Sequence, residues 1–212
     1  MSPTPRYGAT ARWLHWLMAA LVIGLVFVGA TMVDSVAPWQ ADAVRWHKLG
    51  GLLVLALAVW RLVYRLRHPA PPLPDDLPKL QAFAARGAHV ALYALLFAMP
   101  LVGWAMQGAA GLPVVLPGGW VLPALLGPDL ATYGLLREAH AWLAYGLFAL
   151  VLVHAGAALQ HGLVRGDGVL RSMLRGRSAL EGVTASNLDK LVMAVSTTVK
   201  ESEWSPQQAR LA

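Results

Sequence analysis

Cysteine is absent from this sequence, and charged residues make up only 13% of its 212 positions. The absence of cysteine excludes disulfides, thiolate metal sites and cysteine-bound iron–sulfur clusters. A soluble domain carries about 25% charged residues, so the shortage of charge indicates a surface that faces lipid over much of its area. The residues that remain for metal chemistry are seven histidines.

Hydrophobic residues make up 57% of the chain and gather in four long runs, at residues 13–32, about 49–64, 88–106 and 139–159. A helix of about twenty apolar residues crosses the roughly 30 Å hydrocarbon core of a bilayer. Helices satisfy their own backbone hydrogen bonds in lipid. The sequence therefore predicts an all-α integral membrane protein, a bundle of four transmembrane helices, and the third helix is expected to kink at Pro100.

A fifth apolar run, at residues 112–126, is interrupted by three prolines and by the pair Gly118 and Gly119. Proline and glycine at this density are typical of loops. We therefore expect a loop at the membrane interface, anchored by Trp120, because tryptophan is enriched at that depth.

The basic residues indicate how the chain is oriented. The net charge is +6, and the arginines and lysines lie between the apolar runs rather than on one polar face. This pattern is typical of membrane topology and argues against nucleic-acid binding. Most of these residues precede the first helix, join the second to the third, or follow the fourth, so the positive-inside rule places both termini in the cytoplasm. The first run is long for a signal-peptide core and carries His15, so we expect it to be a membrane helix.

The chain is expected to contain two regions. Residues 1–177 would form the membrane domain, and residues 178–212 a polar cytoplasmic tail with a short helix at 188–199. Residues 68–78, which are rich in proline, would form a stiff connector between the second and third helices.

The histidines gather at two depths of the predicted bundle. His47 and His140 lie near the outer ends of the second and fourth helices. The inner group lies on the first, third and fourth helices and comprises His15, His89, His154 and His161. His140 and His154 are fourteen residues apart, close to four turns, so they share one face about 21 Å apart, and His161 continues that face. Ionisable residues inside membrane spans are costly and are candidates for function.

Haem is the cofactor that this pattern indicates. Imidazole is a common axial ligand of haem iron, and two histidines from different helices would close both axial positions. Depth alone leaves open whether His15 pairs with His89 or with His154. Without cysteine the haems would be of b type and bound non-covalently. The small residues expected to admit a flat macrocycle beside the ligands are Gly50, Gly51 and Gly156.

The sequence resembles the bacterial di-haem cytochrome b561 family over roughly residues 6–175. The matching stretches are residues 6–8, 14–17, 47–51, 61–62, 69–74, 88–89, 99–101 and 138–140, together with Tyr93, Gly103 and His154. The resemblance implies a multi-pass protein of the bacterial inner membrane with two b haems. It implies that His15 and His154 hold the cytoplasmic-side haem, and that His47 and His140 hold the periplasmic-side haem.

The best understood activity of that family is the oxidation of superoxide with reduction of ubiquinone, which makes both molecules expected partners. His89 and His161 remain near the inner haem and are candidate quinone residues, because quinone reduction needs proton donors; the alternative is structural hydrogen bonding. Arg45, Lys48 and Arg137 are the basic residues on the outer side. They are candidate catalytic residues that guide superoxide towards the haem edge, or they neutralise haem propionates.

Two other functions stay open on the sequence. The chain could be a cytochrome b subunit that passes electrons between a partner dehydrogenase or hydrogenase and quinone. It could instead be a non-redox transporter or sensor in which histidines relay protons. A copurifying partner would indicate the first function, and a spectrum without haem would indicate the second. A homodimer and a complex with a partner redox subunit both remain open.

Overall fold

The computed structural model describes residues 7–33, 36–69, 72, 76–175, 187–190, 192–194 and 196 of the chain. Its long helices are α1 (Ala9–Val33), α2 (Gln40–Arg67), α3 (Lys79–Ala109) and α4 (Leu130–Leu159). α4 continues as the π-helix η1 (Gln160–Arg165), and the short helix α5 (Val169–Leu174) follows. Each long helix has the length and composition needed to cross a membrane, so the four predicted transmembrane helices are confirmed.

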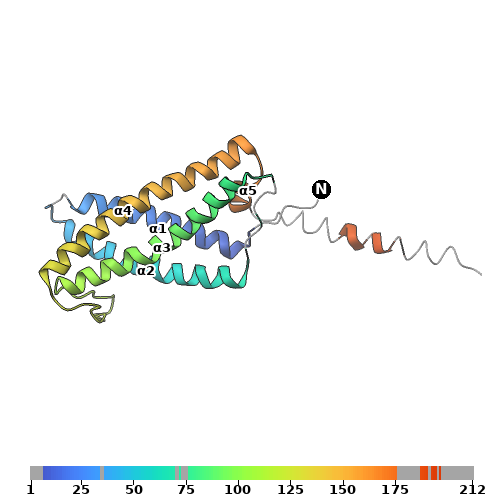
Figure 1. The fold of residues 1–212 in the computed structure, drawn as a ribbon. Coiled ribbons are helices and arrows are strands. Elements are labelled where there is room, and N and C mark those ends of the chain that lie inside the picture. Colours follow the sequence, from blue (N-terminus) through green and yellow to red (C-terminus); the bar gives the residue numbers. More distant parts are fainter. Residues whose placement is uncertain are drawn as a thin grey trace, which may run out of the picture. The chain divides into compact units, whose positions relative to one another are not determined.

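The four long helices lie side by side along a common direction (Figure 1). α1 packs on α2, α2 on α3 and α3 on α4. The α1–α2 connection and the long α3–α4 loop lie at one end of the bundle, and the α2–α3 connection and α5 lie at the other end. Helices that follow one another in the sequence are therefore antiparallel neighbours, as in other up-and-down bundles.

The chain divides into two compact units, Met1–Leu174 and Arg175–Ala212. The first unit holds the bundle. In the second, residues 187–190, 192–194 and 196 are helical, and the rest of the expected short helix at 188–199 lies outside the described residues. The domain boundary after residue 177 and the cytoplasmic location of the tail stay predictions.

The segment between α3 and α4 is a loop, as its prolines and glycines predict. It contains one isolated antiparallel bridge and a turn at Gly118 and Gly119, whose φ angles are 87° and 82°. Glycine suits these positions because other residues are strained at such angles. Asp129 caps α4 by accepting a hydrogen bond of 2.7 Å from the backbone N–H of Thr132. Hydrogen bonds from the side chain and backbone of Thr132 lower the pKa of Asp129.

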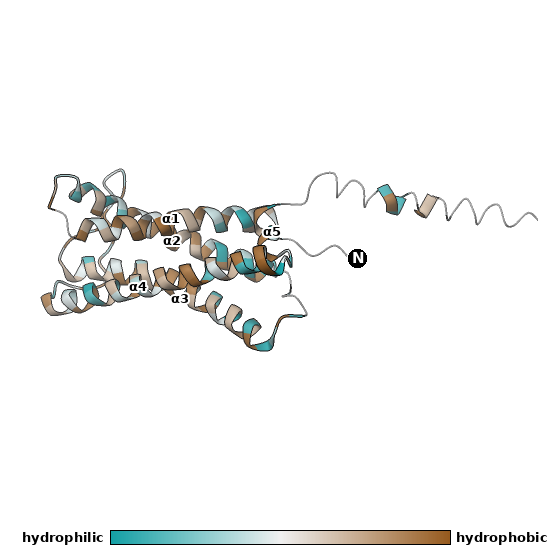
Figure 2. Ribbon diagram, turned by 90° about the horizontal axis from the view of Figure 1, so that it is seen from above, coloured by the Kyte–Doolittle hydropathy of each residue, from teal (hydrophilic) through white to brown (hydrophobic). Residues whose placement is uncertain are grey.

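Large apolar side chains cover the outside of the bundle. Trp13, Phe27, Trp60 and Leu152 are all more than half exposed. In Figure 2, hydrophobic residues run along the helices, and most hydrophilic residues lie towards the two ends of the bundle. Exposed apolar surface on this scale is unfavourable in water but suits the hydrocarbon of a bilayer.

Candidate functional site

A spacing of fourteen residues recurs on the inward faces of all four long helices. Fourteen residues are close to four turns, so the two members of each pair share one face about 21 Å apart. One set of positions, here called the outer layer, comprises Gly29, His47, Gly103 and His140. The other set, here called the inner layer, comprises His15, Arg61, His89 and His154.

Apolar side chains fill the halfway position on the same helix faces. Val22, Val54 and Leu147 form one buried cluster, and Leu96 packs against it. Each of these residues lies seven positions from one member of the outer layer and from one member of the inner layer. A heptad spacing keeps side chains on the seam between packed helices. Packed apolar side chains therefore separate the two polar layers.

In the outer layer, the rings of His47 and His140 lie with their centroids 6.2 Å apart and their planes at 73°. Their Nδ1 atoms are buried and have no hydrogen-bond partner of good geometry. The backbone of Leu25 nevertheless approaches His47, and that of Met99 approaches His140. A weak bond from Nδ1 to a backbone carbonyl would hold each ring with its Nε2 free to bind a metal.

Glycines occupy the two other positions of the outer layer. A Cβ atom on Gly29 would lie 3.2 Å from Cε1 of His47, and a Cβ atom on Gly103 would lie 3.2 Å from Cε1 of His140. These distances are shorter than the optimal carbon–carbon separation of about 3.5–4.0 Å. The two glycines therefore let α1 and α3 come close to the histidine rings.

The glycines that the sequence indicated lie in other surroundings. A Cβ atom on Gly50 would meet the side chain of Leu25, and one on Gly51 would meet Pro100 at 4.0 Å. A Cβ atom on Gly156 would have nothing within 4 Å. The role of these three glycines beside a macrocycle stays a prediction. The glycines that contact the histidines lie on other helices, and the sequence did not indicate them.

Three histidine rings gather in the inner layer. The centroids of His15 and His154 are 6.1 Å apart, with the ring planes at 70°, which is nearly the arrangement of the outer pair. The centroid of His89 lies 5.4 Å from that of His154. The structure brings together all three histidines, and the choice of His15 and His154 as the ligand pair stays a prediction.

Each layer contains one pair of imidazoles, His47 and His140 or His15 and His154, whose separation suits one metal ion. With metal–imidazole bonds of about 2 Å, rings on opposite sides of one ion have centroids about 6 Å apart, close to the observed 6.1 and 6.2 Å. Within the part of the chain that the structure describes, no group of three or more histidine, aspartate or glutamate side chains could hold a metal ion. The residues therefore fit a metal whose other ligands come from a macrocycle, as in haem with two axial histidines.

Arg61 is the member of the inner layer that the sequence analysis missed. Its Nε donates a hydrogen bond of 3.2 Å to the hydroxyl of Tyr93 on α3, while its Nη1 is buried without a hydrogen-bond partner. In the sequence, Arg61 stands among the basic residues at the end of the second apolar run, where arginine usually marks topology. The signal that could have identified it is its position fourteen residues after His47.

The three candidate catalytic cations differ in exposure. Arg45 and Arg137 are exposed, whereas Lys48 is half-buried. The Nζ of Lys48 donates a hydrogen bond of 3.4 Å to Oε1 of the buried Gln107. All three cations lie on α2 or α4, the helices that also carry the outer histidines.

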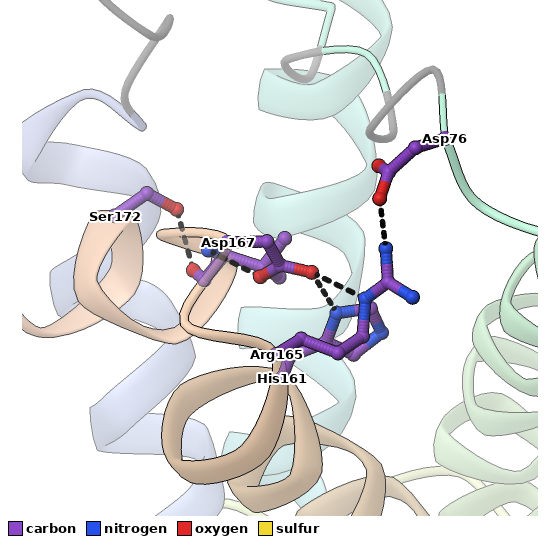
Figure 3. Close-up of polar contacts among 6 residues, drawn as sticks. Asp76, His161, Arg165, Asp167 and Ser172 are labelled. Atoms are coloured by element: carbon purple, nitrogen blue, oxygen red, sulfur yellow. Dashed lines mark hydrogen bonds and ion pairs between the residues drawn. The ribbon is translucent and has the colours of Figure 1, made fainter.

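His161 belongs to a polar network at the end of α4 (Figure 3). Asp167 accepts hydrogen bonds from Nδ1 of His161 and, at 3.0 Å, from Nε of Arg165. Nη2 of Arg165 donates at 2.7 Å to Asp76 of the α2–α3 connection, and the backbone N–H of Val169 donates at 3.2 Å to Asp167. Burial acts to raise the pKa of Asp167, but the hydrogen bonds from His161, Val169 and Arg165 outweigh it, and the pKa is lowered.

The surroundings of His161 differ from the prediction that it simply continues the face of His140 and His154. α4 changes to π-helical geometry at Gln160, and π-turns inside helices often occur near functional sites. Asp167 was missed because it follows the apolar run, where a carboxylate is unremarkable in a sequence. The close pairing of the two side chains becomes visible only in the folded chain.

Comparison with known proteins identifies relatives along most of the chain. The sequence profile of the prokaryotic cytochrome b561 family matches residues 6–176. Cytochrome b561 homolog 2 of Escherichia coli K12 is 35% identical over 181 residues, which cover 84% of this chain and 96% of that protein. A Yersinia pestis protein named probable superoxide oxidase CybB is 29% identical over 178 residues, or 80% of this chain and 96% of that protein. Cytochrome b561 homolog 1 of Escherichia coli K12 is also 29% identical, over 80% of this chain and 97% of that protein.

Proposed function

The chain belongs to the prokaryotic cytochrome b561 family, whose members bind haem b, and we propose that it holds two haems, one between His47 and His140 and one between His15 and His154. The observation that carries this proposal is the nearly equal separation of the two histidine pairs, 6.2 and 6.1 Å between centroids. When bound, each haem would supply one-electron transfer.

The protein is a multi-pass protein of the bacterial inner membrane. The basic residues of the N-terminal segment, of the last turns of α2 and first turns of α3, and of the region after α4 support an orientation with both termini in the cytoplasm. In that orientation the outer layer lies towards the periplasm and the inner layer towards the cytoplasm. An electron that enters at the outer layer would therefore leave at the cytoplasmic end of the bundle.

Ubiquinone is the proposed acceptor at the inner end. Its reduction takes two electrons and two protons and yields ubiquinol, so the site must supply protons as well as electrons. The imidazole of His161 is a suitable donor because histidine exchanges protons near neutral pH. Asp167 holds that ring through Nδ1 and so fixes its orientation. His89 is a second candidate on α3, next to His154.

Superoxide is the proposed donor at the outer end. The relative named probable superoxide oxidase CybB supports this choice. Two superoxide ions give up two electrons and leave two molecules of oxygen, which balances the reduction of one ubiquinone by two electrons and two protons. Superoxide is a small anion, and Arg45, Lys48 and Arg137 would attract it to the outer layer. Outer-sphere transfer at the haem edge needs no open iron site.

The haem content tests the proposal directly. We expect two haem b per chain, released intact by acid and organic solvent because the sequence offers no cysteine for thioether attachment. Pyridine haemochrome analysis with an independent protein determination measures the ratio. One haem or none in pure protein that has been saturated with haem would contradict the two-site arrangement.

The quinone assignment predicts a separate effect. His161→Gln should slow the reduction of ubiquinone by the prereduced protein by about a hundredfold, the lower end of the contribution of a general acid. Asp167→Asn should slow it less, because the donor remains but loses the carboxylate that positions it. Stopped-flow oxidation of the haems by a soluble ubiquinone measures both rates.

The control for these variants is Ser172→Ala, which removes only the 2.7 Å hydrogen bond from the Ser172 hydroxyl to the backbone of Val169 in the same region. It should leave the rate unchanged. Haem content should stay at the wild-type value in all three variants. Wild-type rates in both His161→Gln and Asp167→Asn would exclude this network from quinone reduction.

A further inference from the structure

Arg61 is a cation on the interior face of a membrane helix. α2 places it in the inner layer, fourteen residues after His47, where its charge acts on His15 and His154 and, together with that of Arg65, on His89. Tyr93 holds the guanidinium from one side by accepting a hydrogen bond from Nε. The Nη1 atom is buried and has no hydrogen-bond partner. The side chain is thus fixed at one end and has an unused donor at the other.

No carboxylate among the described residues neutralises this charge. The acidic residues that form ion pairs at the same end of the bundle are Asp76 and Asp167, and both pair with Arg165. Asp42, Asp129 and Glu138 lie at or near the starts of α2 and α4, at the opposite end. A guanidinium does not lose its proton in a protein, and a half-buried charge without a partner inside a membrane span is costly. An anion beside the inner histidines would offset this cost.

The two layers differ in the residues on the helices that provide no proposed haem ligand. In the outer layer, both helices that provide no ligand carry a glycine, Gly29 or Gly103. In the inner layer, the corresponding helices carry Arg61 and His89. A flat macrocycle could approach the backbone in the outer layer, whereas in the inner layer it would meet a fixed cation. The haem in the inner layer would carry its own carboxylates, which would be the anions nearest to Arg61.

We propose that Arg61, positioned by Tyr93, binds a carboxylate of the inner haem. The inference rests on the proposed binding of that haem by His15 and His154. The planar fork of arginine matches a carboxylate better than any other cationic side chain does. The pair neutralises a negative group beside the iron, and so it favours the reduced haem over the oxidised one. This difference between the layers would direct electrons from the outer haem to the inner haem.

The first test is the midpoint potential of each haem in Arg61→Gln, measured on the full chain in detergent without quinone. We expect the midpoint potential of the inner haem to fall by about 59 mV or more, which corresponds to a tenfold change in the ratio of reduced to oxidised haem for a one-electron couple. The midpoint potential of the outer haem should not change. Arg61→Lys, which keeps the charge but not the fork, should give a smaller shift.

The matched control is Arg67→Gln. Arg67 is the last residue of α2 and is exposed, so solvent screens its charge and its removal should change the inner potential much less. If Arg61→Gln does not accumulate in the membrane, Tyr93→Phe removes only the hydroxyl that positions the guanidinium. That variant should lower the inner potential by a smaller amount. An inner potential that is unchanged in both Arg61→Gln and Tyr93→Phe would overturn the inference.

The second test identifies the anion. In the wild-type chain, haem dimethyl ester should leave the inner site at least about tenfold faster than unmodified haem, because the ester removes the carboxylates. In Arg61→Gln the ratio of the two dissociation rates, ester to unmodified haem, should fall towards one. A double-mutant cycle gives this result when the two altered groups contact each other. An equal ratio in both proteins, with a raised KM for quinone in Arg61→Gln, would instead assign the cation to quinone and overturn the inference. Wild-type protein without an inner haem would overturn the proposed function as well.

Discussion

Replacing His140 with alanine is expected to leave the protein with one haem instead of two, and the haem that is lost should be the outer one. His47→Ala should have the same effect, because both imidazoles would be needed to hold that haem. His15→Ala and His154→Ala should instead remove the inner haem. Haem-to-protein ratios give the number that remains, and a potentiometric titration shows which of the two waves has disappeared.

The matched control is His68→Ala, which should keep both haems. His68 is exposed, lies in neither layer, and stacks on Tyr64 with the ring centroids 4.3 Å apart. The inner assignment has its own critical comparison, because the ring centroid of His89 lies closer to that of His154, at 5.4 Å, than that of His15 does, at 6.1 Å. If His89→Ala empties the inner site while His154→Ala leaves it filled, the proposed pairing is wrong.

The four helices could be predicted because the bilayer imposes both their length and their apolar surface. Their ends could not. α2 begins at Gln40 and α3 at Lys79, each about nine residues before the apolar run that identified it. These first turns carry charged residues such as Asp42, Arg45 and Arg86. Hydropathy detects the part of a helix that contacts hydrocarbon, whereas backbone hydrogen bonding continues into the interface.

The candidate ligands could also be predicted, because an ionisable residue inside a membrane span stands out in the sequence and a fourteen-residue spacing fixes its face. Glycine gives no such signal, so the contacts of Gly29 and Gly103 with the outer histidines emerged only from the packing of neighbouring helices. Arg61 was ambiguous for a different reason. An arginine near the end of a span normally marks topology, and only its hydrogen bond to Tyr93 and its buried Nη1 distinguish it.

Superoxide is expected to reduce the outer haem about tenfold more slowly at 1 M salt than at 0.1 M salt. Electrostatic focusing raises association rates by about 10–10³-fold. The Debye length falls from about 10 Å at 0.1 M to about 3 Å at 1 M, so the outer cations would then act only at short range. Stopped-flow mixing of the oxidised protein with superoxide, followed by haem absorbance, measures the rate at each ionic strength.

The outer cations should respond differently to salt because their exposure differs. Arg137 is exposed, so Arg137→Gln should slow the reaction at low salt and match the wild type at 1 M. Lys48 is half-buried against Gln107, and buried charges are screened less, so Lys48→Gln should keep part of its deficit at 1 M. Arg171→Gln, on α5 at the opposite end of the bundle, should behave as the wild type.

A fast reaction whose rate depends neither on salt nor on either substitution would retain superoxide as the donor and exclude electrostatic steering. No haem reduction beyond that of free haem would exclude superoxide and favour a cytochrome b subunit that receives electrons from a partner protein.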